Sequence, residues 1–249
     1  MKNLLQKTCF MFIALAMNFA SCTNENVPEL NQSELIETSN SVRFKYLGIE
    51  YLAEYEIQNS QRIFKDKTLG EMLQTLENDS LCSSITYPNG MIEYFDSIED
   101  FEKRANTLKE GNISSKSIPY KVLIEITLKI YEHENYQGEN FTYRGETFVH
   151  NLRNATNKPE NGVTNPDSYD DFNDKMTSFQ FIGSLRTYDM TIAPPPTHNV
   201  RAMVTFYEDA EYKSKAMAYI IDTQNPQVLI SNIGKGFNDK ASSIKMTYL

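Results

Sequence analysis

Cysteine is scarce in this chain. Its 249 residues include three cysteines, Cys9, Cys22 and Cys82, and the first two fall in an N-terminal segment that we expect to be processed. One remaining cysteine cannot form an internal disulfide, so the stability of an exported body must come from its hydrophobic cores, with a bound metal as a further contribution. We expect Cys82 to be a small buried side chain rather than a nucleophile.

Positive charge is also scarce. The chain has 24 lysines and arginines against 33 aspartates and glutamates, a net charge of −9. Loss of Lys2 and Lys7 with a cleaved signal leaves 22 positive charges and a net charge of −11. An acidic protein repels phosphate backbones, which excludes nucleic acid as an expected partner. The excess of acidic residues is compatible with cation binding, and the need for solubility is an alternative explanation for it.

The apolar run near the N-terminus, Cys9–Ala20, is too short to span a membrane and has the proportions of a signal peptide. It leads into Phe19-Ala20-Ser21-Cys22, which resembles the lipobox of bacterial lipoproteins, although leucine is usual where Phe19 stands. We expect residues 1–21 to be a lipoprotein signal peptide and Cys22 to be lipidated. Residues 22–41, rich in Asn, Glu and Ser, then form a flexible tether. The alternative is an ordinary cleaved signal with a chance cysteine.

This signal predicts an exported protein, held in the bacterial cell envelope through a lipid anchor only.

Motifs for catalysis are missing: there is no Gly-rich phosphate loop, no His-Glu-x-x-His and no Gly-x-Ser-x-Gly. The histidines, His133, His150 and His198, have no metal-ligand spacing. We therefore do not expect an enzyme.

Residues 42–109 have the pattern of a small α+β domain in the order strand, strand, helix, strand, strand, helix. Val42, Phe44 and Tyr46 alternate as in a strand, and Tyr51–Ile57 continues as a second strand. Thr68 and Glu71 have capping-box spacing for the first helix, and Ser97 caps the second. Asn89-Gly90 predicts a tight hairpin between the last two strands.

A linker follows at 110–118, and residues 119–249 are all-β in character. Ile124, Ile126, Leu128 and Ile130 recur 76 residues later as Val200, Ala202, Val204 and Phe206. Behind each of these alternating runs lies an aromatic-Glu hairpin: Tyr131-Glu132-His133-Glu134-Asn135-Tyr136-Gln137-Gly138 and Tyr207-Glu208-Asp209-Ala210-Glu211-Tyr212-Lys213-Ser214. The pattern predicts an internal repeat of two similar units.

Each hairpin is followed by a second signature. These signatures are Asn173-Asp174-Lys175-Met176-Thr177-Ser178 and Asn238-Asp239-Lys240-Ala241-Ser242-Ser243, with an offset of 65 between them. The first unit therefore carries 11 extra residues, which we expect within 153–170. Both signatures are rich in oxygen donors of the kind that Ca²⁺ prefers. A single such signature is more often an ordinary turn, in which Asn, Asp and Ser bond the local backbone.

The doubled pattern resembles the calcium-binding βγ-crystallin family. Its unit is a four-stranded Greek key with an aromatic-acid-x-x-x-aromatic-x-Gly hairpin and a late Asn/Asp-Asn/Asp-x-x-Ser/Thr-Ser signature. The resemblance implies a two-sheet sandwich of two keys for residues 119–249 and covers none of the preceding domain. Ser214 stands where the family has glycine, so we expect the second hairpin to be altered or slightly strained.

The resemblance also implies two calcium sites, each shared between the keys. One would use the carbonyls of Glu132 and Lys175, the Thr177 hydroxyl and the Asp239 carboxylate. The other would use the carbonyls of Glu208 and Lys240, the Ser242 hydroxyl and the Asp174 carboxylate. Asn173 and Asn238 would organise the loops, and Ser178 and Ser243 would anchor each loop to its hairpin. Asp167, Asp170 and Asp171 precede the first site and have the pattern of a solvated acidic loop.

Three functions stay open at this point. The first is a lipid-anchored envelope protein that binds calcium for stability. The second is a surface module that recognises a glycan or a protein, with calcium purely structural. The third is an inhibitor or toxin-like secreted protein, as some proteins of this fold are.

Overall fold

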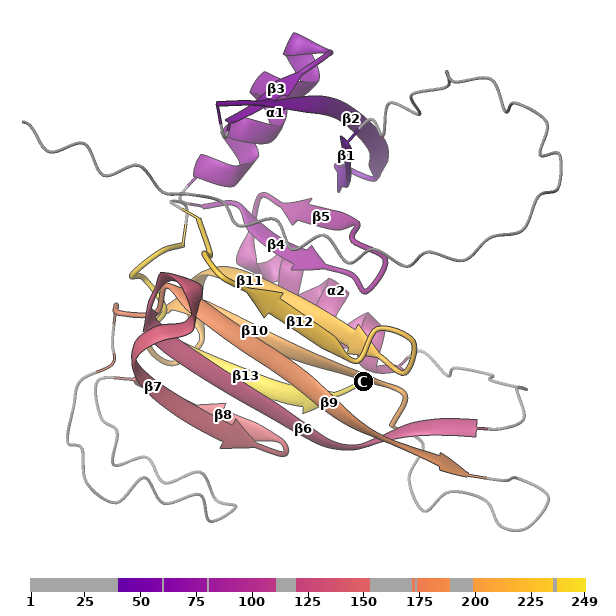
Figure 1. Ribbon diagram of the computed structural model, residues 1–249, viewed down its shortest axis with the longest axis vertical. Coiled ribbons are helices and arrows are strands. Elements are labelled where there is room, and N and C mark those ends of the chain that lie inside the picture. Colours follow the sequence, from indigo (N-terminus) through magenta and orange to yellow (C-terminus); the bar gives the residue numbers. More distant parts are fainter. Residues whose placement is uncertain are drawn as a thin grey trace, which may run out of the picture. The chain divides into compact units, whose positions relative to one another are not determined.

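The computed structural model describes residues 40–59, 61–79, 81–110, 120–152, 172, 174–188, 199–234 and 237–249 (Figure 1). The predicted signal peptide, Cys22, nearly all of the tether and nearly all of the linker at 110–118 lie outside these residues. So do Asn173 and the insertion at 153–170. Within the described ranges, neither helix has the length and apolar character needed to span a bilayer.

The N-terminal segment contains one more strand than the sequence predicts. Its elements are β1 (Asn40–Tyr46), β2 (Ile49–Gln58), β3 (Gln61–Phe64), α1 (Lys67–Asn78), β4 (Ser83–Thr86), β5 (Ile92–Phe95) and α2 (Ile98–Glu110). The extra strand, β3, pairs antiparallel with β2. It is short and mostly exposed, so it has no alternation of buried and exposed side chains that reveals a strand in sequence.

The predicted N-terminal cap is wrong for α1 and right for α2. Asp66, not Thr68, caps α1: its Oδ1 accepts a hydrogen bond from the Leu69 amide at 3.1 Å. The predicted box with Thr68 is wrong because the helix begins two residues earlier. Ser97 caps α2 as predicted, accepting from the Asp100 amide at 3.1 Å and donating to its carboxylate at 2.9 Å.

The hairpin between β4 and β5 is present, with a turn that differs from the expected one. Of the two central residues, only Gly90 has a positive φ, at 79°. Asn89 stays outside the left-handed region and instead accepts a hydrogen bond from the Met91 amide through its side chain, at 3.1 Å.

The C-terminal part forms two facing sheets. Its strands are β6 (Tyr120–His133), β7 (Gln137–Arg144), β8 (Thr147–Val149), β9 (Ser178–Tyr188), β10 (Arg201–Asp209), β11 (Lys213–Asp222), β12 (Gln227–Ile230) and β13 (Ser243–Tyr248), with a short 3-10 turn η1 (Glu134–Tyr136). One sheet has the order β12-β9-β6-β7, and the other ends in β11-β10-β13-β8. Each half therefore places three strands in one sheet and exchanges its third strand into the other, a double Greek key (Figure 1).

The repeated alternating runs face each other inside this sandwich. Ile126, Leu128 and Ile130 of β6 and the matching residues of β10 are all fully buried in one hydrophobic cluster. Ile124 does not follow the prediction, because a bulge between Leu123 and Glu125 shifts the register of β6 against β9. Leu123 is buried in its place, and Ile124 is 44% exposed.

The N-terminal strands continue the second key's sheet. β4 pairs parallel with β11, with Met217 opposite Ser84 and Tyr219 opposite Thr86, and the full order is β3-β2-β1-β5-β4-β11-β10-β13-β8. Ser39–Leu249 accordingly form one compact unit. The division into a domain at 42–109 and a domain at 119–249 stays a prediction about independent folding.

The helices cover opposite faces of this sheet. Ile85 of β4 packs in a cluster with Phe101 of α2, whereas Tyr94 of β5 packs in a cluster with Leu73 of α1. Paired residues share a face of the sheet, and Tyr94 is paired with Ser84. Because successive residues of a strand point to opposite faces, Ile85 lies on the other face, and so do the two clusters relative to each other. α2 therefore buries the outer face of the second key, including Ala216 and Ala218.

Candidate functional site: paired loops between the Greek keys

The two late signatures lie side by side and cross over. The Thr177 hydroxyl donates to Asp239 Oδ1 at 3.1 Å, and the Ser242 hydroxyl donates to Asp174 Oδ1 at 3.2 Å. Each key thus supplies the hydroxyl for one pair and the carboxylate for the other. The offset of 65 makes Thr177 and Ser242 matching positions of the two units. In the structure, each of these hydroxyls contacts the aspartate of the other key.

Backbone bonds hold the crossed loops in the same symmetric way. The Asp239 amide donates to the Met176 carbonyl, and the Asp174 amide donates to the Ala241 carbonyl, both at 3.2 Å. Both aspartates have a left-handed backbone, with φ of 54° and 56°. Aspartate tolerates this conformation better than most residues do, which fits its place at the turn of each loop.

Each loop is also fastened to its own hairpin. The Thr177 amide donates to the Tyr131 carbonyl at 3.0 Å, and the Ser242 amide donates to the Tyr207 carbonyl at 2.9 Å. Glu132 and Glu208 directly follow these tyrosines in the chain. Each loop therefore lies next to the chain segment that carries the glutamate of its own hairpin.

Two serines tie the hairpin tips to the loops. The Ser178 hydroxyl donates to the His133 carbonyl at 2.6 Å and accepts from the Tyr136 amide at 3.1 Å. In the second key, the Ser243 hydroxyl donates to the Asp209 carbonyl at 2.7 Å and accepts from the Tyr212 amide at 3.1 Å. These hydroxyls use their donor and one acceptor position inside the fold, so their contacts are structural.

The glutamate side chains distinguish the two sites. Glu132 Oε2 accepts a hydrogen bond from the Glu139 amide at 3.4 Å and lies 3.8 Å from His133 Nε2. Glu208 instead forms an ion pair with Lys240 at 3.3 Å. In the second site, a side-chain bridge therefore joins the two residues whose carbonyls are the predicted ligands. A lysine ammonium also lies close to the ligand set.

A cavity of about 530 Å³ opens at the second site. Asp174 and Asp239 both line it, so the two predicted carboxylates face one shared space. Its other lining residues are Asn151, Glu208, Asp209, Ala210, Lys240 and Ser242. Sequence reasoning missed Asn151, which follows β8 in a stretch without repeat partners, and Asp209, which the repeat pairs with His133.

The donor chemistry of this site fits a hard divalent cation. Its predicted ligands are all oxygens, from carbonyls, hydroxyls and carboxylates, and Ca²⁺ binds six to eight such oxygens. Since the Thr177 and Ser242 protons already point to carboxylates, their oxygen lone pairs are left for an ion. Asn238 adds an unusual feature: its Nδ2 donates to Asp239 at 2.8 Å, while its buried Oδ1 accepts no hydrogen bond from any described residue.

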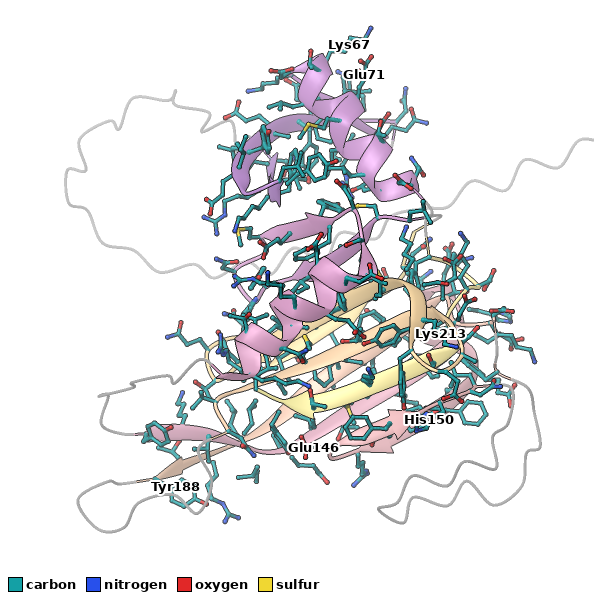
Figure 2. The ribbon with its side chains drawn as sticks, turned by 180° about the vertical axis from the view of Figure 1, so that it is seen from behind. Lys67, Glu71, Glu146, His150, Tyr188 and Lys213 are labelled. Atoms are coloured by element: carbon teal, nitrogen blue, oxygen red, sulfur yellow. The ribbon has the colours of Figure 1, made fainter. Side chains whose placement is uncertain are left out.

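No group of three His, Cys, Asp or Glu side chains gathers as a metal cluster among the residues that the structure describes. His150 lies beside the β10–β11 hairpin, at the same end as Lys213 (Figure 2). It pairs with Glu211 at 3.1 Å and packs on the Tyr212 ring. Asn173, the acidic cluster at Asp167, Asp170 and Asp171, and His198 lie outside the described residues.

The solved structures that this chain resembles are βγ-crystallin domains. A domain from Clostridium beijerinckii is 20% identical, with a TM-score of 0.28, over 49% of this chain and 97% of that one. A βγ-crystallin from Ciona intestinalis is 18% identical, with a TM-score of 0.27, over 49% and 99%. A clostrillin double mutant, solved in complex with nickel, is 20% identical, with a TM-score of 0.28, over 49% and 98%. No protein-family model matches the chain, and the curated proteins contain no match.

Proposed function

We propose that residues 119–249 form a calcium-binding βγ-crystallin domain with two sites shared between its Greek keys. The observation that supports this proposal is the reciprocal pair of contacts, Thr177 to Asp239 and Ser242 to Asp174. Glu132 and Lys175 would complete the first site with their carbonyls, and Glu208 and Lys240 would complete the second. Calcium supplies a charge that neutralises the carboxylates and draws the two loops together.

Calcium in this proposal has a structural role. An ion that binds the folded chain and not the unfolded one stabilises the fold by about 2.7 kcal/mol at a concentration one hundred times its Kd. With two carboxylates for two divalent ions, the affinity belongs with sensor and extracellular modules rather than with tight buffers. An exported protein held by a lipid at Cys22 would meet such calcium concentrations outside the cytoplasm. We propose no enzymatic activity.

Calcium titration of the full chain tests this proposal, with magnesium as the control ion. We expect a calorimetric isotherm and a rise in Tm at millimolar calcium, and neither with magnesium. Asp239→Ala removes the first site, Asp174→Ala removes the second, and the double variant removes both. Glu50→Ala with Glu56→Ala, two exposed carboxylates of β2, makes the same change in charge and leaves binding intact. Calcium binding by the Asp174/Asp239 double variant at the affinity of the unchanged chain would disprove the assignment.

A further inference from the structure

The second candidate site contains an ion pair between two residues of its proposed ligand set. Lys240 Nζ lies 3.3 Å from Glu208 Oε1, and both residues line the cavity of about 530 Å³ at this site. The backbone carbonyls of the same two residues are proposed calcium ligands. Glu208 belongs to the end of β10, and Lys240 belongs to the loop before β13. The pair therefore links the two chain segments that would have to hold the ion together.

The matching residues of the first key are not linked in this way. Glu132 and Lys175 both belong to the described part of the chain, and no ion pair joins them there. The Glu132 carboxylate instead accepts a hydrogen bond from the Glu139 amide at 3.4 Å and lies 3.8 Å from His133 Nε2, both within its own hairpin. The two keys therefore share a glutamate and a lysine at matching positions but differ in what these side chains contact.

Partial burial makes this ion pair harder to open than a surface pair. The Lys240 and Glu208 side chains are 37% and 26% exposed. Lys65 and Glu54 form a pair at the same distance of 3.3 Å, with side chains that are 46% and 44% exposed. Partly buried charges are screened less by water and salt than exposed ones, so the Lys240–Glu208 pair is the more persistent of the two.

A calcium ion at the second site would act on the two members of the pair in opposite ways. The Lys240 ammonium would be repelled by a dication held on its own carbonyl, whereas the Glu208 carboxylate would be attracted. The carboxylate can turn toward the ion only after the pair opens, and a state that must first be populated lowers the apparent affinity. Lys215 also interacts with both charges, but its ammonium is held by the Asp79 carbonyl at 2.7 Å.

We propose that Lys240 is a tethered competitor of calcium at the second site. In the calcium-free chain its ammonium occupies the Glu208 carboxylate. In the calcium-bound chain this carboxylate turns to the ion, and the ammonium moves into solvent. The second site is therefore the weaker of the two, and the first site fills before it. This inference rests on the proposed calcium function and adds a role for the Lys240 side chain to that of its carbonyl.

Calcium titration of single-site variants measures the competition. Asp239→Ala leaves only the second site, and Asp174→Ala leaves only the first. Lys240→Met in the Asp239→Ala chain should raise the calcium affinity about two- to fivefold, which corresponds to the loss of one such ion pair. The same change in the Asp174→Ala chain should have no effect. Lys65→Met, which breaks the exposed pair with Glu54, is the matched control and should alter neither affinity.

Repulsion through space between Lys240 and calcium would also raise the affinity of the Lys240→Met variant. Glu208→Gln separates the two explanations, because this variant has no ion pair to open. Competition predicts that Lys240→Met adds little to the affinity in the Glu208→Gln chain, whereas repulsion predicts the same rise with and without Glu208. Equal rises in the two backgrounds would overturn the proposal.

Chemical labelling of lysines reports the displacement independently of affinity. Limited acetylation of the Asp239→Ala chain, read by mass spectrometry, should modify Lys240 about threefold faster with calcium than without, because the released ammonium is exposed. Labelling of Lys65 should not change. Calorimetric calcium binding without any change in the labelling of Lys240 would refute the displacement and leave the calcium function standing. Absence of calcium binding by the unchanged chain would refute the calcium function, and the competitor with it.

Discussion

Left-handed backbone is the residue-scale feature that the two hairpins share. Three matching positions have positive φ in both: Asn135, Tyr136 and Gly138 in the first, and Glu211, Tyr212 and Ser214 in the second. The expectation that Ser214 alters the second hairpin is therefore wrong for the backbone conformation, because the matching residues of both hairpins are left-handed. A Cβ on Gly138 would lie 2.8 Å from His133 Cδ2, whereas Asp209 replaces this histidine in the second key and hydrogen-bonds the Ser214 hydroxyl.

The exchange of these two residues should have unequal effects on stability. Gly138→Ser adds left-handed strain of about 1–2 kcal/mol and forces His133 to move. Ser214→Gly relieves a similar strain but loses a hydrogen bond of about 1 kcal/mol, so it should be nearly neutral. Urea denaturation of both variants measures the difference. Equal losses of stability would contradict the role given to His133 and Asp209.

At the scale of elements, a buried carboxylate joins β1, β5 and α2. Glu93 is 7% exposed and accepts a hydrogen bond from the Tyr87 hydroxyl at 2.5 Å. Arg104 Nε lies 3.1 Å from this carboxylate and Lys45 Nζ lies 2.9 Å from it. Burial alone would raise the pKa of Glu93, but the hydrogen bonds from Tyr87 and Lys45 and the charge of Arg104 outweigh it, so its pKa is lowered.

This network predicts a pH-dependent loss of stability. Because the folded pKa lies below the unfolded value of about 4.3, the stabilisation is complete above that value and is lost as pH falls through the folded pKa. Glu93→Gln should lower the free energy of unfolding by about 1.5–3 kcal/mol at pH 7, the range for hydrogen bonds to a charged group, and by progressively less below about pH 4. Glu54→Gln, which breaks an exposed pair with Lys65, should cost under about 1 kcal/mol. A Glu93→Gln penalty that stays constant with pH would rule out the ionised pair as its source.

The elements also show what the sequence could and could not predict. Regular alternation in β6 and the offset of 76 predict both keys, because one face of each strand is buried by the other key. The crossed contacts of Thr177 and Ser242 do not follow from the repeat, which only makes the two residues equivalent; the family resemblance implies them. The pairing of β4 with β11 does not follow, although the buried run from Ala216 to Ile221 is typical of a strand covered on both faces. Such a run indicates that something covers both faces of the strand but does not identify the covering element. Asn151, which lines the cavity at the second site, lies outside the repeated motifs.

At the scale of the whole molecule, one sheet joins the candidate calcium loops to the N-terminal segment. The Ser242 amide is fastened to Tyr207, whose ring packs against Phe101 of α2 at 6.5 Å between centroids. Lys245 of β13 lies over the Tyr207 ring and 3.8 Å from Glu102 of the same helix. Any ligand that orders the second loop therefore acts on strands that also carry α2 and β4.

We expect the two segments to unfold as one cooperative unit and to gain protection from calcium together. Separate domains would confine the effect of calcium to the Greek keys, whereas a continuous ladder extends it into β4 and β5. Hydrogen exchange measured by mass spectrometry, on peptides covering 83–95 and 213–222, reports both sides of the junction. Calcium should slow exchange in both by a similar factor, and the Asp174/Asp239 double variant should lose both effects. Protection confined to 213–222 would mean that the N-terminal segment opens independently, despite the bonds from β4 to β11 and from Lys215 to Asp79.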